Sequence, residues 1–224
     1  WANTRMRYST NGGSTFADCG SRPGTETFQD REWITVDNTP TSPCYGNLYV
    51  TWHSTNQEKV AVSTDGCATF GAAASLSGLY SAITPDLTTM ADGHALVFWH
   101  NYATGDESFK IRGSTDCGVS WFAPSLRVVK TKYADVNATA PAQCDRGVSN
   151  QVAIGADVAP SSAFYGRLYA VMFDMNQTGC MTASTWSCAQ WDASWSNTRN
   201  WDVWLATPDD GGPTSFKAIQ RRGS

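Results

Sequence analysis

The stretch Ser63-Thr64-Asp65-Gly66-Cys67-Ala68-Thr69-Phe70 decides the fold, because the chain contains it three times in recognisable form. The other two copies are Ser9-Thr10-Asn11-Gly12-Gly13-Ser14-Thr15-Phe16 and Ser114-Thr115-Asp116-Cys117-Gly118-Val119-Ser120-Trp121. Each reads Ser-Thr, Asp or Asn, a glycine-bearing pair, any residue, Ser or Thr, and an aromatic residue. The copies start at positions 9, 63 and 114, so the repeats are 54 and 51 residues long. A period of this length indicates an array of similar supersecondary units.

Turn chemistry explains every position of the repeated stretch. The short side chain of Asp65 can accept hydrogen bonds from the amides that follow it, as in an Asx-turn. Glycines supply the positive φ that a side chain would disfavour, and the aromatic residue can pack between neighbouring sheets. We therefore assign structural roles to Ser9, Asn11, Gly13, Phe16, Ser63, Asp65, Phe70, Ser114, Asp116, Gly118 and Trp121.

The three stretches resemble the Asp-box of the sialidase-like (BNR repeat) β-propellers. The resemblance implies an all-β propeller with four-stranded antiparallel blades of about 50 residues. Runs of β-branched and aromatic residues around each box fit this rhythm, as in Trp33–Val36, Asn47–Trp52 and Lys59–Val62. The sequence predicts a blade portion at 1–28 and blades at 29–78, 79–130 and 150–220.

The first repeat is incomplete, because only the strand Arg5–Tyr8, its box and the outgoing strand are present. The resemblance implies a ring of six or more blades, and an exposed sheet edge is a liability. We therefore expect these three and a half blades to be a portion of a six- or seven-bladed propeller. A further segment or a second chain would complete it, and a divergent four-bladed ring is the alternative.

The composition excludes some classes of partner and indicates the compartment of the protein. The net charge is −4, from 16 Lys and Arg against 20 Asp and Glu, which gives no basic field for nucleic acid. No stretch approaches the ~20 apolar residues of a membrane helix, so membrane insertion is not expected. Seven cysteines favour a secreted or cell-surface protein. None forms a C-x-x-C pair or lies near a histidine in zinc-site spacing, so no metal or cofactor is expected.

The strand assignment suggests two disulfides. Cys44 lies in the loop after the first strand of its blade and Cys67 in the box of the same blade, and both loops emerge on one face. We expect a Cys44–Cys67 bond. Cys180 and Cys188 bracket a short polar loop and can close it.

Candidate catalytic residues stand at the start of the second repeat. In sialidase-like enzymes the active site lies on the face opposite the boxes, and Asp30, Arg31 and Glu32 would enter the inner strand there. These residues could serve as an acid and a clamp for a substrate carboxylate. The alternative is an ion pair or turn cap at the strand start. The Arg-Ile-Pro sequence of sialidases is absent, so the sialidase triad cannot be assigned.

Candidate glycan contacts come from a long loop and from two histidines. Trp186, Trp191 and Trp195 lie with Asp192 among polar residues, a mix that suits sugar rings. The alternative is a satellite core that pins the loop. His53 and His100 follow Trp52 and Trp99 at equivalent blade positions, which predicts that both line the mouth of the central channel.

The resemblance implies a secreted propeller that recognises a glycan or glycoconjugate, as an exo-glycosidase of the sialidase type or as a binding domain. The alternative function is that of a non-catalytic structural or protein-interaction propeller in an extracellular or cell-surface assembly.

Overall fold

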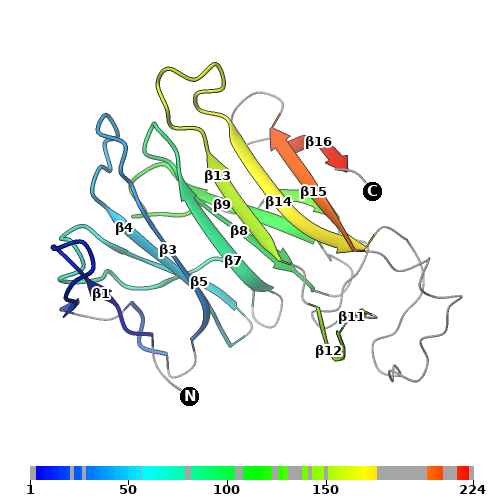
Figure 1. Ribbon diagram of the computed structural model, residues 1–224, viewed down its shortest axis with the longest axis horizontal. Coiled ribbons are helices and arrows are strands. Elements are labelled where there is room, and N and C mark those ends of the chain that lie inside the picture. Colours follow the sequence, from blue (N-terminus) through cyan, green and yellow to red (C-terminus); the bar gives the residue numbers. More distant parts are fainter. Residues whose placement is uncertain are drawn as a thin grey trace, which may run out of the picture.

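The computed structural model describes residues 4–20, 23–26, 29–55, 57–78, 82–103, 108–122, 126–130, 138–140, 143–148, 151–175, 201–208 and 216–221. These residues form antiparallel β-sheets joined by turns and loops, and no helix occurs among them. Successive sheets lie side by side along the molecule (Figure 1). The all-β, four-stranded architecture predicted from the sequence is confirmed.

Three sheets have four strands each, in sequence order. The second blade contains β3 (Asp30–Val36), β4 (Leu48–Ser54), β5 (Gln57–Ser63) and β6 (Ala74–Ser75). The third contains β7 (Ala82–Thr89), β8 (Ala95–Asn101), β9 (Ser108–Ser114) and β10 (Leu126–Lys130). The fourth contains β13 (Val152–Ala156), β14 (Leu168–Met175), β15 (Trp201–Pro208) and β16 (Phe216–Arg221).

Two smaller sheets complete the described part. Strands β1 (Arg7–Tyr8) and β2 (Ala17–Asp18) pair within the first repeat. Strands β11 (Ala138–Ala140) and β12 (Gln143–Val148) pair antiparallel with each other. In the sequence they lie between the third and fourth blades, and the sequence analysis did not predict them.

The core lies between neighbouring blades. Trp52 and Trp99 are fully buried at the same position of the second strand of their blades. Trp99 packs with Tyr49 and Leu87 between the second and third blades, and Phe98 packs with Met172 between the third and fourth. The second strands are therefore covered on both faces, which makes them the most apolar part of each repeat.

Each repeated turn forms the predicted hydrogen-bond network. The Ser63 hydroxyl accepts from the Cys67 amide at 2.9 Å, and Asp65 Oδ1 accepts from the Thr69 amide at 2.8 Å. The turns at 9–16 and 114–121 repeat both bonds. The hydroxyl and amide of Thr69 hold the pKa of Asp65 down at about 2. Asp65 is therefore charged at neutral pH, and its carboxylate organises the turn.

The aromatic residues that end the turns divide into two groups. Phe70 and Trp121 pack against the cores of their blades, as predicted. Phe16 of the first repeat is 61% exposed, contrary to the expectation that it packs between sheets. Its sheet has only two described strands, so it offers little surface for Phe16 to pack on.

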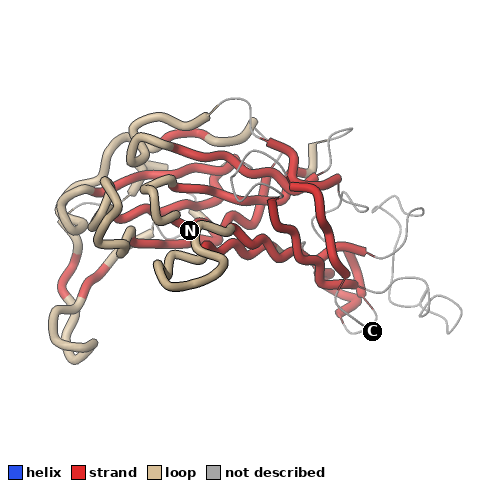
Figure 2. Tube along the Cα trace, turned by 90° about the horizontal axis from the view of Figure 1, so that it is seen from above, coloured by secondary structure: helices blue, strands red, loops and turns tan. Residues whose placement is uncertain are grey.

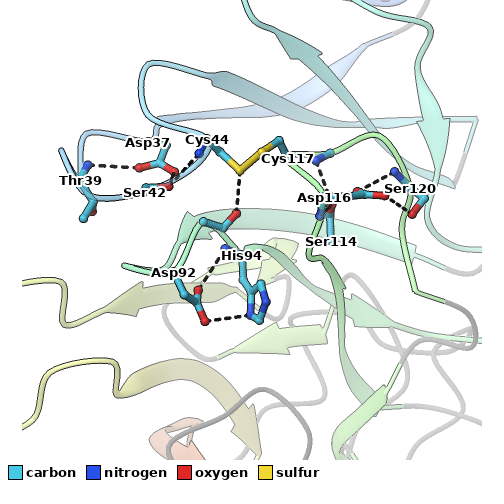
Figure 3. Close-up of a disulfide and its surroundings, with 12 residues drawn as sticks. Asp37, Thr39, Ser42, Cys44, Asp92, His94, Ser114, Asp116, Cys117 and Ser120 are labelled. Carbon is cyan, nitrogen blue, oxygen red and sulfur yellow. Dashed lines mark hydrogen bonds and ion pairs between the residues drawn. A yellow bond between two sulfur atoms is a disulfide. The ribbon is translucent and has the colours of Figure 1, made fainter.

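The disulfides differ from the predicted pairing. Cys44 pairs with Cys117 (Figure 3). Cys67 pairs with Cys19, so the predicted Cys44–Cys67 bond is wrong. Each bond joins the turn of one blade to the preceding repeat. Cys180 and Cys188 lie outside the described residues.

The β3–β4 loop explains why Cys44 reaches the next blade. Asp37 Oδ1 accepts from the Thr39 amide at 3.1 Å, and its Oδ2 accepts from the Ser42 hydroxyl, which closes the loop (Figure 3). Cys44 then lies with its Sγ 3.3 Å from the Gly93 carbonyl of the third blade. The loop therefore faces the neighbouring blade, where Cys117 is its partner.

The described loops and turns gather mainly at one end of the strands (Figure 2). This end holds the repeated turns and both disulfides, and we refer to it as the turn face. No described helix is long and apolar enough to span a membrane.

The Cys44–Cys117 bond should contribute strongly to stability. It closes a loop over a sequence separation of 73 residues, for which loop entropy gives about 4 kcal/mol. Replacing both residues by serine should lower the urea midpoint and increase the slope of the transition, because the unfolded chain without the crosslink exposes more surface. The comparison variant is Cys180→Ser/Cys188→Ser, which leaves Cys44 and Cys117 unchanged. Equal midpoints for the parent and the Cys44→Ser/Cys117→Ser variant would contradict the assigned pairing.

Candidate functional site

The predicted charged residues lie together where β3 begins. The β3–β4 ladder has a bulge between Asp30 and Trp33, and Arg31 within it has a φ of 56°. Positive φ is costly for a residue with a side chain, by about 1 to 3 kcal/mol, and such strain is common at functional sites. Thr84 has a φ of 58° in the matching bulge of β7, so the bulge itself belongs to the blade. What distinguishes β3 is the charge that its bulge displays.

Two hydrogen bonds and one ion pair position the three charged side chains. Asp30 Oδ1 accepts from the Arg31 amide at 2.9 Å, and Arg31 Nε lies 3.9 Å from Asp30 Oδ2. Glu32 Oε1 accepts from the Thr4 hydroxyl at 2.6 Å. Asp30 and Glu32 are exposed, and Arg31 is partly exposed. Two carboxylates and one guanidinium therefore reach solvent within three consecutive residues.

An exposed indole adjoins this cluster. Trp33 follows Glu32 directly and is 51% exposed. We call Asp30, Arg31, Glu32 and Trp33 the β3 entrance. The ion-pair interpretation weighed from the sequence also has support, because Asp30 and Arg31 do approach each other.

A buried ionisable pair lies on β4 and β5, next to the β3 entrance. His53 lies opposite Asp30 on β4, and Glu58 lies opposite His53 on β5, so the three residues form a row across three strands. His53 Nδ1 and Glu58 Oε1 are 3.6 Å apart, and both side chains are buried. Burial raises the pKa of Glu58 to about 7, although His53 and Arg31 act in the opposite direction.

Glu58 could have been found from the sequence. Its position two residues before Val60 places it on the same face of β5 as that core residue. A charged residue in phase with a buried one indicates a buried charge, which requires a partner.

The two histidines do not reach the surface, contrary to the expectation that they line a channel mouth. His53 is 4% exposed and His100 is fully buried. His100 packs beside Phe109, with ring centroids 5.3 Å apart, and burial lowers its pKa to about 4. The reason is that both residues belong to second strands, which neighbouring blades cover on both sides. Neither imidazole can contact a glycan at the described surface.

The sequence did not single out Asp86, a buried carboxylate between the third and fourth blades. Its Oδ1 accepts from the Leu87 amide at 2.6 Å and its Oδ2 from the Ile154 amide at 2.8 Å. Burial nevertheless raises the pKa of Asp86 to about 6. Because Ile154 lies in β13, the first strand of the fourth blade, this carboxylate ties adjacent blades together and has a structural role.

The remaining candidate glycan contacts lie outside the described residues, so their role in glycan binding stays a prediction. They are Trp186, Trp191, Trp195 and Asp192. Within the described ranges, no three His, Cys, Asp or Glu side chains lie close enough together to hold a metal ion.

Glu58 should make stability depend on pH. Its folded pKa of about 7 exceeds the usual 4.5, so its contribution is fully present below pH 4.5 and is lost as pH rises through about 7. The shift corresponds to about 3 kcal/mol over this interval. In Glu58→Gln, the fall in the free energy of unfolding between pH 4.5 and 7 should be smaller by up to this amount, as measured by urea titration.

The matched control for Glu58→Gln is Glu32→Gln, which alters an exposed carboxylate and should keep the parent pH dependence. If Glu58→Gln retains the parent dependence as well, the buried carboxylate does not titrate as described.

Comparison with known proteins establishes the fold. No protein-family profile matches the chain, and no curated protein matches it. Several solved structures do. A mutant of the NanB sialidase from Streptococcus pneumoniae gives a TM-score of 0.53 at 13% identity, over 95% of this chain and 27% of that one. The leech intramolecular trans-sialidase gives 0.53 at 14% identity, over 97% and 28%.

A glycosidase of different specificity has the same fold. The α-L-arabinofuranosidase of Fusarium graminearum, in complex with arabinobiose, gives a TM-score of 0.53 at 15% identity, over 97% of this chain and 57% of that one. The chain thus spans about a quarter of the sialidase chains and 57% of the arabinofuranosidase chain. We conclude that the chain has the fold of the sialidase-like β-propellers.

Proposed function

We propose that this chain recognises glycans at the β3 entrance and contributes to an exported exo-glycosidase of the sialidase type. The observation that carries the proposal is the exposed set of two carboxylates, one guanidinium and one indole at the strained start of β3. The glycosidases of the same fold support a glycan as the ligand, and two disulfides support an oxidising compartment.

Each group of the entrance suits a part of a sugar. An indole offers a flat apolar surface for the C–H face of a pyranose ring, and carboxylates accept hydrogen bonds from its hydroxyls. A guanidinium can pair with a sugar carboxylate through two parallel hydrogen bonds. Arg31 therefore favours acidic sugars over neutral ones.

The carboxylates also provide the chemistry for hydrolysis. Glycoside hydrolysis uses one carboxyl group to protonate the leaving oxygen and a second group to activate water or to attack the anomeric carbon. Asp30 and Glu32 are our candidates for these roles. Thr4 orients Glu32 by donating to its Oε1, and the bulge fixes Asp30 beside Arg31.

A non-catalytic role in protein interaction is the second candidate function. The observation that favours it is the exposure of apolar side chains on β3, where Ile34 and Val36 are each about half exposed. Catalysis and interaction make different demands, since the first needs the carboxylates and the second needs the apolar face.

Loss of either entrance carboxylate should reduce hydrolysis. We expect Asp30→Asn and Glu32→Gln each to lower kcat/KM for sialosides by about 10² to 10⁴-fold, the usual contribution of a positioned acid or base. The assay is release of the terminal sugar from a panel of sialosides and other glycosides. Asp92→Asn is the matched control, because this exposed carboxylate lies in the β7–β8 turn on the turn face. No turnover with retained glycan binding would reject the enzyme and keep the binding function.

Arg31 should decide the preference for acidic sugars. Arg31→Gln removes the charged donors, so affinity for sialosides should fall about tenfold or more while affinity for neutral glycans stays unchanged. Binding to an immobilised glycan panel measures both. An equal loss for acidic and neutral glycans would indicate a structural role for Arg31, and the absence of binding to every glycan would reject the proposal.

A further inference from the structure

Glu58 stands at a position where the other blades have an apolar residue. It lies opposite His53, the residue that follows the buried tryptophan of β4. In the third blade the residue at this position is Phe109, opposite His100. In the fourth blade, whose second strand begins with the same Leu-Tyr pair as β4, it is Val203. The blade therefore accepts an apolar residue here and does not require a carboxyl group.

The surroundings of the Glu58 carboxyl group are unfavourable for a charge. The side chain is fully buried, and neither of its oxygens accepts a hydrogen bond from a described residue. His53 Nδ1 lies 3.6 Å from Oε1, which is longer than a hydrogen bond. A buried ionisable group without such bonds costs stability, and groups of this kind gather at functional sites.

The charged groups that act on Glu58 come from the two neighbouring strands of its blade. They are His53 on β4 and Arg31 on β3, and both favour the ionised carboxylate. From the third blade, Tyr102 is close enough to be affected in turn, since burial and then the charge of Glu58 raise the pKa of its hydroxyl. Strand β6 has no titratable residue, and Asp86 of β7 is bonded toward the fourth blade.

Arg31 connects this buried group with the surface. Its side chain is 32% exposed and belongs to the bulge of β3. At the equivalent bulge of β7 the residue of positive φ is Thr84, and the row behind it consists of Ile83, His100 and Phe109. The cation on the bulge and the buried acid therefore occur together in the second blade, and both are replaced in the third.

We propose that Glu58 is a positioning residue for Arg31 and makes the recognition of acidic sugars at the β3 entrance dependent on pH. When Glu58 is ionised, its charge attracts the guanidinium inward and competes with the carboxylate of a sugar. When Glu58 is protonated, this attraction is lost, and Arg31 can pair with the sugar. The inference rests on the proposed function, because it takes a sugar carboxylate as the ligand of Arg31.

The direction of the pH effect follows from linkage. An acidic sugar that pairs with Arg31 weakens the attraction that favours ionised Glu58, so the pKa of Glu58 rises above its value of about 7 in the free protein. The complex therefore takes up a proton when it forms near pH 7. Affinity is highest when Glu58 is protonated, and it falls as pH rises through about 7.

The direct test is the binding of 3′-sialyllactose to the 224-residue protein at about pH 5.5 and about pH 8.5, measured by calorimetry. Glu32→Gln is the common background and prevents turnover. We expect about tenfold tighter binding at the lower pH, which corresponds to a rise of about one unit in the pKa of Glu58. Adding Glu58→Gln should make the two affinities equal. Asp86→Asn is the matched control, because it alters another buried carboxyl group, and it should keep the parent ratio.

A variant of His53 separates the two buried groups. His53→Gln removes a group that favours the ionised carboxylate, so the pH dependence should persist with its midpoint at higher pH. A pH dependence that disappears in His53→Gln and survives Glu58→Gln would assign the titration to His53 and overturn the inference. Glu58→Met resembles the apolar residues of the other blades, and it replaces Glu58→Gln if the buried amide prevents folding.

The contact between Arg31 and Glu58 can be measured without a sugar. The ¹³C chemical shift of the Glu58 carboxyl group follows its titration, and Arg31→Gln should raise the midpoint because a favourable charge is lost. An unchanged midpoint, or sialyllactose binding that does not depend on pH, overturns this inference and leaves the proposed function standing. Absence of binding to every glycan overturns the proposed function, and the inference with it.

Discussion

The turn between the third and fourth strands is the constraint on which the rest of this structure depends. A tight turn leaves several backbone amides without partners, and here Ser63 and Asp65 accept from them through side-chain oxygens. The same network recurs in three repeats. Because each turn is rigid, it can serve as a fixed attachment point, and the cysteines at 67 and 117 connect it to the preceding repeat.

Anchoring at one end of the strands leaves the other end available for function. Disulfides and turn networks fix the blades on the turn face, and Trp52 and Trp99 fill the space between them. The β3 entrance stands on this scaffold at the start of an inner strand. Strand β7 has the same bulge at the equivalent position. A site can therefore evolve at this position by changes of side chains, without a change of the backbone. This is consistent with glycosidases of different specificity having one fold.

The sequence predicted what depends on local chemistry and missed what depends on neighbouring blades. The turns and strands follow from short patterns, so Asp65 and Asp116 were identified with their roles. The partner of Cys44 depends on which blade its loop faces, which a single repeat cannot reveal. The burial of His53 and His100 depends in the same way on the neighbouring blades. The alternation of side chains along a strand shows which face a residue lies on, but it does not show which blade packs on that face. The charged β3 entrance was predicted from three adjacent residues, whereas its support by Glu58 required the strand register.

The central claim is that the second and third blades are each anchored through their turns to the repeat before them, and disulfide mapping tests this most directly. Trypsin separates the four cysteines, because Arg31, Lys59 and Lys110 lie between successive members of the set Cys19, Cys44, Cys67 and Cys117. Mass spectrometry of the unreduced digest should find the peptides of Cys19 and Cys67 linked, and those of Cys44 and Cys117 linked. A link between the peptides of Cys44 and Cys67 would place the bond within one blade and contradict the account.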